Sequence, residues 1–147
     1  AQKAVATVHV YDSAAVTVTV TPGTKSLMTG GTQTFTASAT GAPSAGTFTW
    51  SASGGTITSA GLFTAPTTPG TYTITATSSW SGVTGTATVA VKSFDLNGDG
   101  AVDTLDILEL AKRYELVDVP TADQAKADFN GDGKIDDTDL SQLLAAI

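Results

Sequence analysis

The sequence contains no cysteine, which excludes disulfide bonds, thiolate metal sites and a cysteine nucleophile. It has a single histidine, His9, with no serine or aspartate partner at the spacing of a catalytic triad, so we interpret His9 as an ordinary strand residue. No segment approaches the ~20 consecutive apolar residues of a membrane span, and no signal peptide is recognisable. These absences disfavour an enzyme, and we predict that the 147 residues carry no catalytic site.

Negative charge is almost missing from the first 93 residues. They hold one acid, Asp12, against three lysines, for a net charge of +2. Residues 94–147 hold thirteen acids against four basic residues, for a net charge of −9, and the two values sum to the stated −7. This asymmetry predicts two domains, residues 13–93 and 94–147. The overall acidity disfavours nucleic acid and anionic membranes as partners.

Helical periodicity is absent from the first domain, which instead shows short runs of alternating apolar and polar residues. Glycine and proline separate these runs at the intervals that turns require. The pattern predicts an all-β antiparallel sandwich. The predicted strands are 5–11, 15–21, 33–40, 47–52, 70–77 and 84–91.

Five motifs of this domain, at 16–22, 31–37, 48–51, 61–66 and 70–77, resemble those of bacterial immunoglobulin-like modules. The resemblance implies an immunoglobulin-like sandwich in which Trp50 is the buried core tryptophan, flanked by Phe35 and by Tyr72 or Ile74. We interpret the module as a spacer. Trp80 falls in a predicted hairpin loop, where an exposed ring could stack on a sugar, but one aromatic is a weak signal for carbohydrate binding.

Residues 6–10 (ATVHV) repeat residues 87–91 (ATVAV) at an offset of 81, which is about one immunoglobulin-like module. Residues 1–12 are therefore interpreted as the last strand of a preceding module or as an extra edge strand. Coincidence between two Thr/Val-rich strands is the alternative. Because the chain begins inside a strand-like run, we expect it to be part of a longer protein.

The second domain contains two twelve-residue segments, 95–106 and 128–139, with side-chain oxygens at the spacing of an EF-hand calcium loop. Gly100 and Gly133 stand at position 6, where the loop turns sharply. Position 12 is aspartate in both, where the ordinary EF-hand has glutamate. The pattern predicts two Ca²⁺ ions, and calcium loops favour an extracellular setting because cytosolic calcium is scarce. The predicted ligands are Asp95, Asn97, Asp99, Ala101 (carbonyl), Asp103 (through water) and Asp106, and Asp128, Asn130, Asp132, Lys134 (carbonyl), Asp136 (through water) and Asp139.

A helix is predicted after each loop from apolar residues at i, i+3, i+4 and i+7. The first face contains Ile107, Leu110, Ala111 and Tyr114, and the second contains Leu140, Leu143, Leu144 and Ile147. A short helix is predicted to start at 121–124, and no helix precedes the first loop. Val102 and Ile135, at position 8 of the loops, are expected to point inward and to form a short β-contact.

Two such loop–helix repeats near the C-terminus resemble a dockerin module, over about residues 94–147. The resemblance implies a small α-helical calcium-binding domain that binds a cohesin module on a scaffold protein and so attaches a secreted protein, such as a polysaccharide-degrading enzyme, to a larger or cell-surface assembly. It also implies partner contacts at Thr104, Leu105, Lys112 and Arg113 in the first repeat and at Asp137, Thr138, Ala145 and Ala146 in the second.

The contact positions differ in charge and size between the repeats, so we predict one dominant binding orientation. Lys112 and Arg113 have an alternative interpretation as a solvated helix face. A second function is also open: a calcium-stabilised structural cap at the C-terminus of an extracellular enzyme or adhesin, with no cohesin partner. Because the second domain has about 50 residues and few apolar ones, we expect its folding to require calcium in either case.

Overall fold

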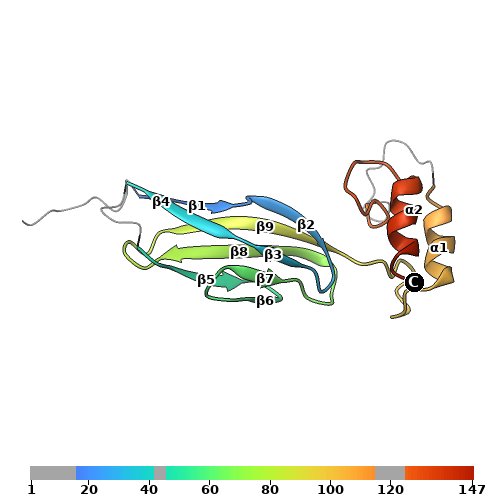
Figure 1. The fold of residues 1–147 in the computed structure, drawn as a ribbon, viewed down its shortest axis with the longest axis horizontal. Coiled ribbons are helices and arrows are strands. Elements are labelled where there is room, and N and C mark those ends of the chain that lie inside the picture. Colours follow the sequence, from blue (N-terminus) through green and yellow to red (C-terminus); the bar gives the residue numbers. More distant parts are fainter. Residues whose placement is uncertain (1–15, 42–45, 115–124) are drawn as a thin grey trace, which may run out of the picture.

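The computed structural model describes residues 16–41, 46–114 and 125–147, which form a β-rich part followed by a pair of helices (Figure 1). We call residues 16–92 the β module and the described residues from 94 onward the C-terminal module. The predicted strand at 5–11 and the predicted helix start at 121–124 lie outside the described residues. The strands are β1 Thr17–Thr21, β2 Thr24–Met28, β3 Thr32–Thr34, β4 Thr36–Thr40, β5 Phe48–Ala52, β6 Thr56–Ile57, β7 Leu62–Thr64, β8 Gly70–Ser78 and β9 Thr84–Lys92.

Three sheets make up the β module. Their strand orders are β2-β9-β8-β5, β1-β4 and β3-β7-β6. The pairs β8–β9, β5–β8, β1–β4, β3–β7 and β6–β7 are antiparallel. β2 pairs with β9 in parallel, with Thr24 opposite Thr88 and Met28 opposite Lys92. The prediction of an antiparallel arrangement is therefore wrong for this pair.

The core of the β module lies between the sheets and follows the alternating pattern of the sequence. In β9 the burial alternates residue by residue, with Ala87, Val89 and Val91 inside. Phe35 and Phe63 meet edge to face, with ring centroids 6.4 Å apart. The full set of buried core residues is Val18, Val20, Phe35, Phe63, Ala65, Ile74, Ala76, Ala87, Val89 and Val91.

Trp50 is not the centre of this core, contrary to the prediction. It is only partly buried and packs against the outside of the cluster that Phe35, Phe63 and Ile74 occupy. Its ring covers Gly61, where an added Cβ would lie 3.2 Å from Trp50 Cζ2. The absence of a side chain at Gly61 lets the indole lie over this edge of the core.

The predicted strand 33–40 is two strands, broken at Phe35. The Phe35 N–H donates to the Gly61 carbonyl at 2.8 Å, and the chain passes there from the sheet of β7 to that of β1. Three strands, β2, β6 and β7, were not predicted. β2 has no apolar–polar alternation, and β6 and β7 have only two and three residues, too few to show a period.

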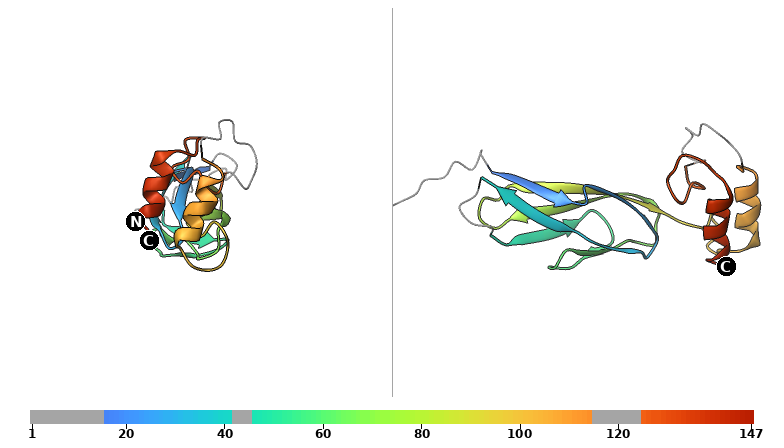
Figure 2. Two further views of the ribbon diagram at one scale, coloured as in Figure 1. Left: turned by 90° about the vertical axis from the view of Figure 1, so that its right-hand side faces the viewer. Right: turned by 45° about the horizontal axis from the view of Figure 1, so that its top comes forward.

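The C-terminal module contains α1 (Thr104–Ala111) and α2 (Asp137–Leu144), which lie side by side (Figure 2). Both helices follow the calcium-loop segments, as predicted. Asp103 and Asp136 are the N-caps, and each begins a capping box with the aspartate three residues later. Neither helix has the length or hydropathy to cross a membrane, nor does any other described helix.

The core of the C-terminal module is separate from that of the β module. It consists of Leu110, Ala127, Phe129, Ile135 and Leu143, with Ile107, Val102 and Leu140 packed around them. The inward orientation of the two position-8 residues is thus confirmed, but neither is in a strand and the expected β-contact is not formed.

Part of each predicted helix face is exposed instead. Ala111 is exposed, and Leu144 and Ile147 are 54% and 57% exposed. Both helices have only eight residues, so Tyr114 and Ile147 lie beyond the last helical residue and do not continue the buried stripe.

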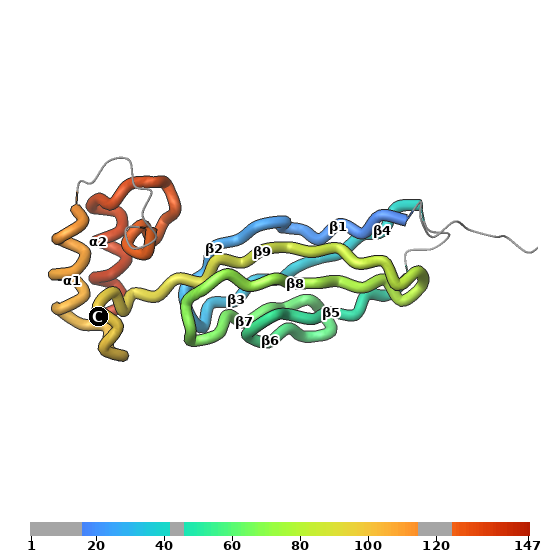
Figure 3. The backbone as a smooth tube through the Cα atoms, turned by 180° about the vertical axis from the view of Figure 1, so that it is seen from behind, coloured from blue at the N-terminus to red at the C-terminus, as the bar shows by residue number. Residues whose placement is uncertain are grey.

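The two modules meet at the end of β9. Figure 3 shows β9 leaving the sheet beside β2 and leading directly into the C-terminal module. Met28, the last residue of β2, packs against the C-terminal core. The chain therefore brings one residue of the β module into the core of its neighbour.

Candidate metal centre

The first loop is organised by backbone N–H groups that donate to its own carboxylates. Asp95 accepts from Gly98 at 2.7 Å through one oxygen and from Gly100 at 3.0 Å through the other. Asp99 accepts from the Ala101 N–H at 2.9 Å and from the Asn97 amide at 2.7 Å. These bonds hold both carboxylates to the short turn that the glycines allow.

The carboxylate of Asp106, at position 12, ties the start of the loop to its end. Its Oδ1 accepts from Leu96 at 2.7 Å and from Asn97 at 3.2 Å, and its Oδ2 accepts from Asp103 at 2.8 Å. Asp103 in turn caps α1 by accepting from Leu105 at 2.7 Å. One carboxylate oxygen of Asp103 is thus engaged in the helix cap, and its predicted contact with an ion through water stays a prediction.

The second loop repeats the network with the same donors and acceptors 33 residues later. Asp128 accepts from Gly131 at 2.6 Å and from Gly133 at 3.1 Å, while Asp132 accepts from Lys134 at 2.9 Å. The remaining equivalent bonds are Phe129 to Asp139 (2.7 Å), Asn130 to Asp132 (2.9 Å), Asp136 to Asp139 (3.0 Å) and Thr138 to Asp136 (2.9 Å). Two segments of different surrounding sequence therefore adopt one loop conformation.

The glycines at position 6 are required by this conformation. Gly100 has φ +91° and Gly133 has φ +85°, a region that other residues rarely adopt. Their N–H groups are also the ones that reach Asp95 and Asp128. Sequence and backbone geometry thus agree at the sharp turn.

Each loop buries one carboxylate side chain completely. Asp106 and Asp139 are both 0% exposed. The described salt bridges join Glu109 to Lys112 and Arg113 and involve neither buried carboxylate. A buried carboxylate is costly unless hydrogen bonds and an opposite charge compensate it. Hydrogen bonds are present here, and a bound cation would supply opposite charge.

Local hydrogen bonds keep two further carboxylates ionised. The Ala101 N–H, together with the Asn97 amide, lowers the pKa of Asp99. The Lys134 N–H, together with the Asn130 amide, lowers the pKa of Asp132. Position 5 of each loop therefore carries a full negative charge at neutral pH.

The predicted ligands of each loop lie within twelve consecutive residues. Among the described residues, however, no three carboxylates are already placed close enough together to coordinate one metal ion. Each is held by backbone donors, and the amide and carbonyl positions complete the set. The donors are all oxygen, which suits Ca²⁺ and not a soft metal. The residues fit calcium in chemistry, in charge and in loop conformation.

The predicted partner residues differ in how available they are. Thr104, Leu105 and Thr138 are exposed, and Leu105 is 51% exposed. Lys112 is bonded to Glu109, whereas Arg113 donates to the Glu109 carbonyl at 2.6 Å and to its carboxylate at 3.0 Å. These bonds join Glu109 of α1 to the two residues that directly follow the helix, as the interpretation of a solvated helix face expects.

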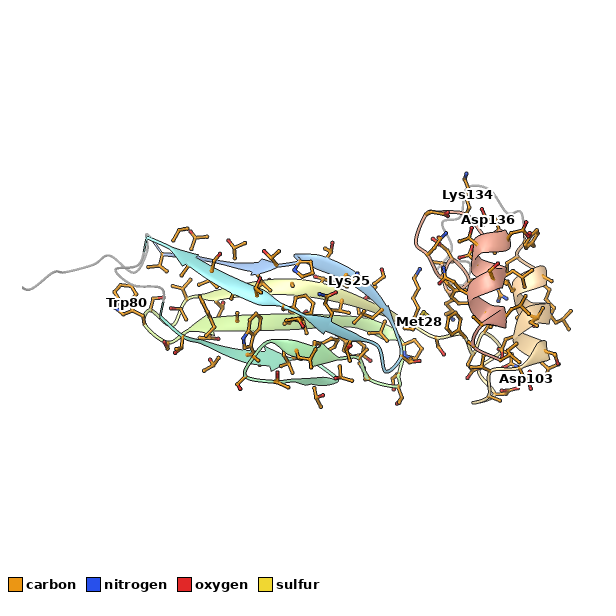
Figure 4. All side chains as sticks on the ribbon, in the orientation of Figure 1. Lys25, Met28, Trp80, Asp103, Lys134 and Asp136 are labelled. Carbon is orange, nitrogen blue, oxygen red and sulfur yellow. The ribbon has the colours of Figure 1, made fainter. Side chains whose placement is uncertain are left out.

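Asp137, another predicted contact, accepts a hydrogen bond from the Tyr114 hydroxyl and so joins the two repeats. Leu108 was missed: it is 54% exposed, one turn after Leu105. The signal was present, because Leu105, Leu108 and Lys112 share one face of a helix at i, i+3 and i+7. Trp80 is 39% exposed and lies at the end of the β module far from the helices (Figure 4).

Residues 88–147 match the family model of the dockerin type I domain, beginning inside β9 and including both loops and both helices. This part of the chain is a dockerin module. Dockerin modules bind calcium and dock onto cohesin domains, and they are typically found on secreted proteins. No curated protein matches the chain. The resemblance drawn from the two loops is confirmed by an independent comparison.

Proposed function

We propose that this dockerin binds two Ca²⁺ ions, one in each loop, and docks onto a cohesin of a scaffold or cell-surface protein. The observation that carries the proposal is the duplicated network, in which each loop buries one carboxylate that accepts backbone N–H groups from both ends of the loop. The ligands are the twelve positions predicted from the sequence. The ions would compensate the negative charge of the loop carboxylates. The loop residues would fix the backbone conformation from which α1 and α2 begin.

The cohesin contact is proposed on α1. Leu105 and Leu108 expose about half of their side chains beside Lys112. The equivalent positions of α2, 33 residues later, are Thr138, Ser141 and Ala145. Exposed leucines on a helix are typical anchors of a helix-mediated contact.

The position of the helices favours the same choice. α2 lies on the side of the β module, and α1 lies on the far side (Figure 1). Gln142 of α2 lines a groove that is also lined by Lys25 and Met28 of β2. A partner of the size of a domain therefore has freer access to α1, which supports one dominant orientation.

We further propose that the β module is an immunoglobulin-like spacer. With the strands lettered along the chain, β2-β9-β8-β5 contains the order G-F-C, and the two smaller sheets give A-B and B-E-D. The Tyr72 hydroxyl in β8 donates to the Thr68 carbonyl at 2.8 Å, the contact of a tyrosine corner. The segment would then anchor a larger secreted protein and take no catalytic part itself.

The direct test measures binding of the 147-residue chain to a panel of cohesins with calcium and with excess EDTA. We expect binding to at least one cohesin in calcium and none in EDTA. Failure across a broad panel, with calcium binding intact, would favour the calcium-stabilised cap. Failure to bind calcium would contradict both readings.

The contact face is tested by matched substitutions in the two repeats. Leu105→Asp and Leu108→Asp place a charge among the exposed apolar atoms of α1, and Thr138→Asp and Ser141→Asp do so at the equivalent positions of α2. Loss of one interface anchor costs roughly 1–3 kcal/mol, or about tenfold to a hundredfold in affinity. We expect this loss for the α1 pair only. Equal losses in both pairs would contradict a single orientation.

A further inference from the structure

The second calcium loop contacts the β module. Lys92, the last residue of β9, extends its ammonium to the main-chain carbonyl of Asp128. Asp128 is position 1 of loop 128–139, and its side chain accepts the Gly131 and Gly133 N–H groups. One residue of the β module is therefore bonded directly to the residue that begins the second calcium loop.

The next loop residue extends the junction. Phe129 is 5% exposed and packs edge to face on Phe94, with ring centroids 4.7 Å apart. Met28 at the end of β2 packs on the same core. The Phe129 N–H donates to Asp139, the position-12 carboxylate of its own loop, at 2.7 Å. The aromatic that fills the junction is thus held in place from within the calcium loop.

No described hydrogen bond joins the first loop to the β module, although Leu96 packs on the same core as Met28 and the residues 95–98 line a groove together with residues 69–71. The described hydrogen bonds of residues 95–106 join loop residues to one another or to Ser93. At the offset of 33, Lys92 corresponds to Ala125 and Phe94 corresponds to Ala127. The internal repeat therefore does not reproduce the lysine donor or the Phe94 ring, whereas Asp128 and Phe129 correspond to Asp95 and Leu96.

We propose that calcium in the second loop fixes the orientation of the β module relative to the dockerin, through a hydrogen bond that the first loop does not make. Ordering of loop 128–139 places the Asp128 carbonyl against Lys92 and the Phe129 ring in the core on which Met28 packs. If that loop loosens, the junction loses the Lys92 hydrogen bond and the packing of Phe129 in this core. The inference rests on the calcium binding proposed above and adds a role for one of the two ions.

Reciprocity makes the proposal measurable. If calcium in the second loop stabilises the junction, the junction must raise the calcium affinity of that loop by the same factor. Lys92→Met keeps the aliphatic stem and removes the donor. Because the lost bond is charge-assisted and half-buried, we expect the affinity of the second loop to fall roughly threefold to tenfold.

The experiment is a calcium titration of the full chain followed by NMR. The Gly100 and Gly133 amides report the two loops separately, because each donates to the position-1 aspartate of its own loop. Residual dipolar couplings at saturating calcium report whether the modules share one orientation. Lys25→Met is the matched control, because Lys25 is exposed on β2 and lines, together with Lys92, the groove between β2 and Gln142 of α2.

The expected result is a single alignment of both modules in the native chain. Lys92→Met should give the two modules separate alignments and lower the calcium affinity reported by Gly133, while the affinity reported by Gly100 stays unchanged. Lys25→Met should leave the single alignment and both affinities as they are in the native chain. Independent alignment of the native modules, an unchanged Gly133 affinity, or an equal change at both glycines would overturn the inference alone. If neither glycine responds to calcium, the proposed calcium binding fails and the inference fails with it.

Discussion

The buried carboxylate of Asp106 offers the most exacting test of how the loops are stabilised. In Asp106→Asn the shape is kept, and the amide oxygen can still accept from Leu96 and Asn97. The amide nitrogen then faces the Asp103 N–H, which donates to Oδ2 at 2.8 Å in the native loop. One acceptor is thereby replaced by a donor in a site that is 0% exposed.

The cost follows from the three bonds. A hydrogen bond to a charged group contributes about 1.5–3 kcal/mol and a neutral one about 0.5–1.5, so the two retained bonds lose about 2 kcal/mol together. The unpaired donor costs about 1–3 kcal/mol more. The total, about 3–5 kcal/mol, is comparable to the whole free energy of unfolding of a module of about 50 residues, roughly 3–8 kcal/mol. Loss of a calcium ligand adds to it.

We therefore expect Asp106→Asn to abolish or nearly abolish the helical circular dichroism of the C-terminal module in saturating calcium, while the strand signal persists. Asp103→Asn is the control: it makes the same chemical change three residues earlier, where asparagine caps a helix as well as aspartate does. Its cost should be below about 0.5 kcal/mol. A thermal midpoint of Asp106→Asn within a few degrees of the native value would refute the assigned role of the buried charge.

Three further outcomes are expected. EDTA should remove the helical circular dichroism and leave the strand signal, because the two cores are separate and only one is built on calcium loops; an unchanged spectrum would contradict this. Phe63→Ala should destabilise the β module by about 3–5 kcal/mol in thermal unfolding, without changing the calcium titration of Gly100. Lys112→Ala should alter the stability of the dockerin by less than about 0.5 kcal/mol, because its bond to Glu109 is exposed, so any larger effect on cohesin affinity reports a partner contact.

The calcium loops could be predicted from the sequence because their chemistry is local. Twelve consecutive residues contain the predicted ligands, the glycine and the helix cap, and both copies fold into the same hydrogen-bonded loop. The helix faces were predicted less well. A period of 3.6 extends through Leu144 and Ile147, but the sequence pattern does not show that an eight-residue helix has already ended.

The β module shows a second limit of local reasoning. Alternation located the long strands β8 and β9, whereas β2 depends on a parallel partner more than 60 residues away and has no pattern of its own. The junction through Lys92 and Phe129 was also beyond prediction. This junction joins the Lys92 ammonium at the end of a strand to a main-chain carbonyl of a distant loop, and no sequence pattern predicts such a contact.

The parallel pairing of β2 with β9 has a mechanical consequence. β1 begins at one end of the β module and β9 ends at the other (Figure 1), and β9 is hydrogen-bonded on both sides, to β2 and to β8. A pull on the docked C-terminal module enters the sheet along β9, parallel to the strand. The load is then shared by many interstrand hydrogen bonds in shear, and the strand cannot peel from an edge one bond at a time. In the proposed anchoring role, tension would thus enter the β module at a strand that is hydrogen-bonded on both sides.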